Sequence, residues 1–83
     1  MARRNTGEAL AQATGVSIDH INDRVATAYN AKYGKEPKAL SYSNIQADPE
    51  VLGRVHFNVN QSGKKIGSAT YKPRHKSVWV NWS

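Results

Sequence analysis

The chain contains no cysteine at all, and it has no acidic residue after Glu50. The lack of cysteine excludes a disulfide-stabilised scaffold and a thiolate metal site, and it fits a reducing compartment, so we expect a cytoplasmic protein. Its three histidines are scattered at His20, His56 and His75, which predicts no metal and no other cofactor. Apolar runs are two or three residues long and the basic N-terminus lacks the apolar stretch of a signal peptide. We therefore expect neither a membrane span nor a membrane partner.

The length of 83 residues allows one domain, covering residues 1–83, with residues 1–7 expected to form a flexible basic arm. A chain of this size buries only about 60% of its unfolded surface, so its core has to be small. We expect a monomer or a small homo-oligomer.

The net charge of +6 is unevenly distributed along the chain. Residues 1–50 hold six basic and six acidic side chains, whereas residues 51–83 hold six basic side chains and no acidic one. A polyanionic partner is the usual physical reason for such an asymmetry, so a nucleic acid, either DNA or RNA, is the expected partner. The alternative is a solvated basic face on a small protein.

Residues 17–33 form the clearest predicted helix. Ser17 is suited to the N-cap, Asp19 favours the positive end of the helix dipole, and Gly34 is placed to end the helix. A shorter helix is expected at residues 8–13. The apolar residues of the main helix recur at the spacing of a one-sided helix: Ile18, Ile21, Val25, Ala28 and Tyr29.

After Ala39 the pattern changes to an alternation of polar and apolar residues, which is typical of strands. The segments 40–45, 54–60, 65–72 and 77–82 follow it. The predicted fold class is therefore α+β, with one amphipathic helix packed on a three- to four-stranded antiparallel sheet.

The loops between the last three strands set the predicted register. With a two-residue loop at Ser62-Gly63, Val59 faces Ile66, and a three-residue loop at 73–75 places the last strand. In the same register Phe57 faces Ser68 and Val55 faces Thr70. The core face then collects Val55, Phe57, Val59, Ile66, Val78, Val80 and Trp82. The opposite face collects Arg54, His56, Asn58, Lys65, Gly67, Ala69, Tyr71, Ser77, Trp79 and Asn81.

This second face is predicted to bind nucleic acid without catalysis, because a flat, basic and aromatic surface suits phosphates and stacked bases. The turn at 72–76 adds a cluster of basic side chains that can donate hydrogen bonds to phosphate. The expected binding residues are Arg54, His56, Lys64, Lys65, Tyr71, Lys72, Arg74, His75, Lys76 and Trp79.

Residues 10–21, Leu10-Ala11-Gln12-Ala13-Thr14-Gly15-Val16-Ser17 with Ile21, resemble the centre of a helix-turn-helix, which implies DNA binding. The sequence departs from that pattern at Arg24, where an apolar residue belongs, and Asp19 and Asp23 would repel phosphate. The departures favour the simpler interpretation of a short helix, a glycine turn and a capped main helix.

Residues 28–72 are similar in element order to the first two thirds of a double-stranded RNA-binding domain. The likeness rests on His56-Phe57-Asn58-Val59 and Gly63-Lys64-Lys65-Ile66-Gly67, and it implies RNA binding. In that family a second helix holds the phosphates, but here the chain continues into Val78-Trp79-Val80.

Two other functions stay open. The first is a small inhibitor of the kind that phages and mobile elements encode, whose basic face binds an acidic surface of a host protein. The second is a metal-free ribonuclease, which needs a base, an acid and cations for the phosphorane. We favour the non-catalytic function because no acidic residue after Glu50 is available to orient a histidine. The candidate ribonuclease residues are Arg54, His56, Tyr71, Arg74 and His75.

Overall fold

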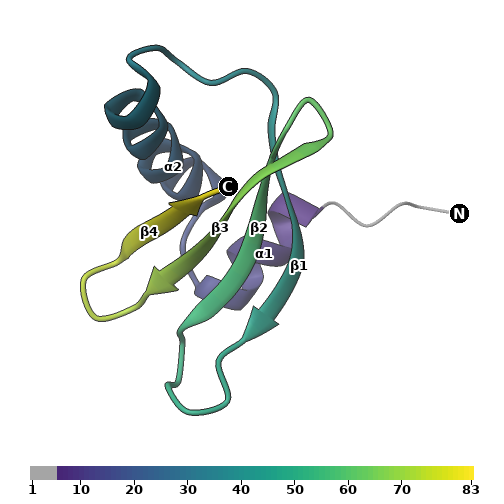
Figure 1. Cartoon of the computed structure of the whole chain (residues 1–83). Coiled ribbons are helices and arrows are strands. Elements are labelled where there is room, and N and C mark those ends of the chain that lie inside the picture. Colours follow the sequence, from purple (N-terminus) through teal and green to yellow (C-terminus); the bar gives the residue numbers. More distant parts are fainter. Residues whose placement is uncertain (1–5) are drawn as a thin grey trace, which may run out of the picture.

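The computed structural model describes residues 6–83 and has two helices followed by four strands. The elements are α1 (Thr6–Thr14), α2 (Ile18–Tyr33), β1 (Leu40–Ala47), β2 (Val55–Gln61), β3 (Lys64–Lys72) and β4 (Ser77–Trp82). The strands form one antiparallel sheet in chain order (Figure 1). The predicted α+β fold is confirmed. Residues 1–5 of the expected N-terminal arm lie outside the described residues, and Thr6 and Gly7 belong to α1.

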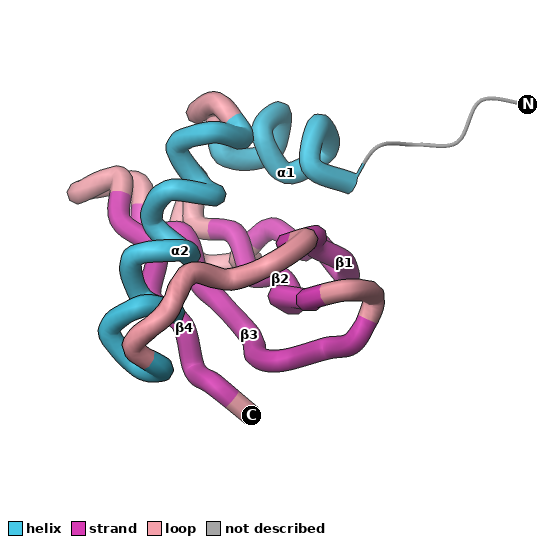
Figure 2. Tube along the Cα trace, turned by 90° about the horizontal axis from the view of Figure 1, so that it is seen from above, coloured by secondary structure: helices cyan, strands magenta, loops and turns pink. Residues whose placement is uncertain are grey.

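Both helices cover the same face of the sheet (Figure 2). α1 packs on β1, and α2 packs on β4 at the other edge. No helix or strand of residues 6–83 covers the opposite face, which we call the open face. The buried core between the two layers consists of Leu10, Ile21, Val25, Tyr42, Val55, Phe57, Val59, Ala69 and Tyr71.

The main helix begins and ends where the sequence predicts. The Ser17 side chain accepts a hydrogen bond from the backbone N–H of His20, and Gly34 ends the helix in the left-handed conformation at φ 74°. The buried face of α2 consists of Ile21, Val25 and Tyr29. Between Thr6 and Ser83, no helix is both long and apolar enough to cross a membrane.

β2 and β3 are joined by the predicted turn, but their pairing then shifts by one residue. Ser62 and Gly63 both have positive φ, 52° and 81°, as a type I′ hairpin requires. The pairs next to the turn follow the predicted register. Beyond them, Val59 pairs with Gly67 instead of Ile66, so Ile66 is the extra residue of a β-bulge.

The bulge exchanges the two faces along the rest of β3, because neighbouring residues of a strand point to opposite sides. The predicted pairing of Phe57 with Ser68 and of Val55 with Thr70 is therefore wrong, since Phe57 pairs with Ala69 and Val55 with Tyr71. Gly67, Ala69 and Tyr71 are the buried residues of β3, and Tyr71 is only 1% exposed.

The turn between β3 and β4 contains a second one-residue difference. Lys72 pairs with Ser77, so the loop has four residues instead of the predicted three, and Lys76 adopts a positive φ of 51°. The one-residue shift at the β-bulge and the one-residue shift at this turn cancel across β3. For this reason Val78, Val80 and Trp82 pack against the core and Trp79 is exposed, as predicted.

Candidate functional site

The open face is a polar surface with one large aromatic side chain. Strand pairing places Trp79, Thr70, His56 and Gln46 in one row that crosses all four strands. The adjoining row holds only hydroxyl and amide side chains: Asn81, Ser68, Asn58 and Ser43.

A shallow hollow of about 290 Å³ lies on this face, and we call it the β3 trough. Ser68 and Thr70 of β3 carry short side chains and form its floor, while longer side chains of the two flanking strands form its walls. The residues that line it are Asn44, Gln46, His56, Phe57, Asn58, Ser68, Ala69, Thr70, Trp79 and Asn81.

Trp79 is 62% exposed at the edge of the trough. The Lys72 ammonium lies 5.8 Å from the centre of the indole, within range of a cation–π interaction. Lys72 itself does not line the trough. Trp79 therefore offers an aromatic surface with a cation next to it.

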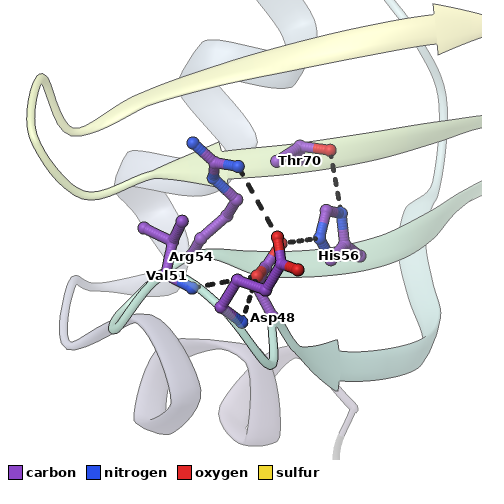
Figure 3. Close-up of polar contacts among 6 residues, drawn as sticks. Asp48, Val51, Arg54, His56 and Thr70 are labelled. Carbon is purple, nitrogen blue, oxygen red and sulfur yellow. Dashed lines mark hydrogen bonds and ion pairs between the residues drawn. The ribbon is translucent and has the colours of Figure 1, made fainter.

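The His56 ring is held at both of its nitrogens (Figure 3). Its Nε2 lies 2.8 Å from Asp48 Oδ2, and its Nδ1 lies 3.1 Å from the hydroxyl oxygen of Thr70. A carboxylate only accepts, so Nε2–H donates to Asp48, and in the neutral ring Nδ1 accepts from Thr70. The ring is half exposed and fixed in orientation.

Asp48 also shapes the loop between β1 and β2. Its Oδ1 accepts hydrogen bonds from the backbone N–H groups of Glu50, at 2.7 Å, and Val51, at 3.0 Å (Figure 3). The hydrogen bond from His56, followed by that from Glu50, lowers the pKa of Asp48 from 3.8 to about 2. The carboxylate is therefore charged at neutral pH.

Asp48 orients His56 from a position eight residues before it, so the expectation that no acidic residue is available to orient a histidine is wrong. The signal that could have found Asp48 is the antiparallel pairing of β1 and β2. Because Gln46 pairs with His56 and Asp48 follows Gln46 by two residues, this pairing predicts that the side chains of Asp48 and His56 are diagonal neighbours on one face.

The predicted binding residues do not form one continuous surface. His56, Lys72 and Trp79 share the open face, and Lys65 joins them because it pairs with the outward-facing Asn60. The prediction that Tyr71 is exposed on this face is wrong, since the β-bulge buries it in the core.

The remaining cations gather at the two ends of the sheet. Lys64 lies at the β2–β3 hairpin, whereas Arg74, His75 and Lys76 are exposed in the turn at 73–76. The eight residue steps of β3 separate these ends by about 26 Å. The basic groups therefore lie at both ends of a polar trough.

Arg54 lies at the turn end of the sheet and is incompletely paired. Its NH1 is 3.9 Å from Asp48 Oδ2, and its buried Nε has no hydrogen-bond partner within residues 6–83. The β1–β2 loop and the 73–76 turn are neighbours, since a Cβ placed on Gly53 would lie 3.2 Å from Pro73. Arg54 thus adds a cation to the end of the sheet at which Lys72 lies.

In the described part of the chain, no three His, Cys, Asp or Glu side chains come together to hold a metal ion. Comparison with known proteins found no matching family model, no matching curated protein and no matching solved structure.

Proposed function

We propose that this protein binds nucleic acid, without catalysis, through the open face of its sheet. The observation that carries the proposal is the exposed Trp79 beside Lys72, on a face that no helix or strand of residues 6–83 covers. Proteins that bind single-stranded nucleic acid combine aromatic stacking surfaces with cations that follow the phosphates.

The distribution of charge supports the same surface. Of the acidic residues, Asp48 already bonds His56, and Glu50 lies in the same loop. The others belong to the helices or to the segment after α2: Glu8, Asp19, Asp23 and Glu36. Phosphates that approach the open face therefore meet more positive than negative charge.

Two triple variants with equal charge test this proposal. Replacing Lys72, Arg74 and Lys76 by alanine should weaken binding to all sequences alike. The slope of log affinity against log salt should shrink by up to about one unit per lost contact. Folding should be intact, because exposed charges contribute little to stability. The matched control replaces Lys32, Lys35 and Lys38, which lie in and after α2.

Binding is measured as a mobility shift over a range of salt concentrations. The control variant should retain more affinity than the turn variant, although both lose three charges. Equal losses would show that only net charge matters and would contradict an interface at the turn. A wild-type protein that shifts no nucleic acid at physiological salt would overturn the proposal and favour the protein-directed inhibitor.

The hydrogen bond from His56 to Asp48 favours one second candidate, metal-free RNA cleavage. A carboxylate that fixes the orientation of an imidazole is a common feature of catalytic bases. His75 takes no part in this network and Tyr71 is buried, so neither residue supports this candidate. RNA turnover that disappears in His56→Ala, while RNA binding persists, would favour the enzyme.

A further inference from the structure

We infer that the β3 trough is a slot for one unpaired nucleobase, held between Trp79 and His56. This inference rests on the proposed function and specifies its substrate class as single-stranded nucleic acid. Thr70 of β3 pairs with Trp79 of β4 on one side and with His56 of β2 on the other. The side chains of Trp79 and His56 therefore lie on either side of a short side chain.

The width of the slot suits a planar ring. Trp79 and His56 belong to β4 and β2, which flank β3, so their backbones are about 9–10 Å apart. A base stacked on the indole of Trp79 needs about 3.5 Å on that side, and on its other side lies the edge of His56 whose Nδ1 is 3.1 Å from the Thr70 hydroxyl. The short side chains of Ser68 and Thr70 leave this space open.

The adjoining row supplies hydrogen-bonding groups for the edge of the base. Asn58 and Asn81 line the trough, and among the described residues their side chains form no hydrogen bond with another protein group. Each amide offers two donors and an acceptor, as the Watson–Crick edge of a base requires. A base in the slot would satisfy groups that the protein itself leaves unpaired.

The His56 wall is preorganised by Asp48. Because Asp48 and Thr70 hold both ring nitrogens, the imidazole does not have to lose rotational freedom when a base enters. Asp48 is therefore a positioning residue. A base can reach the slot only when it is neither paired nor stacked in a duplex, and Lys72 lies beside Trp79 for its phosphate.

The test compares three labelled ligands of about 12 nucleotides by fluorescence anisotropy. They are a DNA single strand, the same strand with abasic sites throughout, and a duplex. The single strand should bind about 5- to 150-fold more tightly than the abasic strand, which is the range for one stacked base. Trp79→Ala should abolish this preference, and its folding should be unaffected because Trp79 is exposed.

Three further variants extend this test. Tyr33→Ala removes the other exposed aromatic residue, which lies on α2, and should leave the preference unchanged. Asp48→Ala should strengthen binding of the abasic strand by removing a negative charge, yet lower the preference for intact single strands. Asp48→Asn should restore that preference in part, because its amide oxygen can still accept from His56.

The outcomes separate the two proposals. If single strand, abasic strand and duplex bind alike, and Trp79→Ala has no effect, the slot is refuted while nucleic-acid binding stands. If none of the three ligands binds, both proposals are refuted. If a neutral oligosaccharide changes the Trp79 fluorescence and the three ligands do not, the trough recognises sugars and both proposals are also overturned.

Discussion

Replacing Gly67 with alanine distinguishes the bulged pairing of β2 and β3 from a regular hairpin. Gly67 is buried and pairs with Trp82 of β4. A Cβ on Gly67 would lie 2.9 Å from the carbonyl oxygen of Asn81 and 3.2 Å from Cε3 of Trp82. The carbonyl belongs to the backbone of a paired strand, so it cannot move aside without disturbing β4.

The expected change in the free energy of unfolding follows from two opposing effects. Overpacking of this kind costs about 1–3 kcal/mol. Alanine also reduces the entropy of the unfolded chain, which returns about 0.4–1 kcal/mol. We therefore expect Gly67→Ala to destabilise the protein by about 1–2 kcal/mol, and to lower Tm by about 4–16 °C in a domain of this size.

Thermal and urea unfolding, followed by circular dichroism, would measure this change. Ser68→Ala is the matched control, because Ser68 is adjacent, faces outward and should change stability by no more than about 0.5 kcal/mol. In a regular hairpin Gly67 would face solvent, and alanine there would stabilise the protein. A Gly67→Ala variant as stable as the wild type, or more stable, would therefore refute the bulged register.

Three other predictions concern the core, the loop and the main helix. Phe57→Ala should cost about 3–5 kcal/mol, because Phe57 is 2% exposed, whereas Asn58→Ala should cost far less. Equal thermal shifts for the two would contradict the register of β2. Because the pKa of Asp48 is about 2 when folded and 3.8 otherwise, its contribution to stability is complete above about pH 4 and is lost as pH falls through 2. Urea unfolding would measure the free energy of unfolding at pH 5 and at pH 2.5. Between these two pH values, Asp48→Asn should lose less of this free energy than the wild type does. Equal losses would show that other groups cause the acid sensitivity. Ser17→Ala should cost about 1 kcal/mol of stability by calorimetry, and an unchanged Tm would show that the N-cap contributes nothing.

The elements whose signals are local could be predicted from the sequence. The bounds of α2 follow from Ser17 and Gly34, because each satisfies backbone groups of the helix end next to it. The turn at Ser62-Gly63 depends on only two residues that accept positive φ. The inward-facing residues of β2 follow from strict alternation within a single strand.

The faces of β3 could not be predicted in the same way, because they depend on contacts with other elements. Ile66 becomes the extra residue where the end of the chain meets β3, and its carbonyl accepts a hydrogen bond from the N–H of Ser83. The resulting register buries Tyr71 in place of Thr70 and gives Trp82 the space above Gly67. Burying the larger apolar area favours this arrangement, and no signal within residues 64–72 encodes it.

Some features of the candidate site could likewise be predicted from the sequence, and others could not. The sequence by itself determined that positive charge accumulates after Glu50 and that Trp79 alternates with Val78 and Val80, because charge and alternation are properties of residue order. Only the tertiary structure decided that Tyr71 is buried, that the cations lie at two ends of a trough, and that Asp48 holds His56. Those features require groups from separate strands to meet, and their meeting depends on how the sheet pairs and packs beneath the helices.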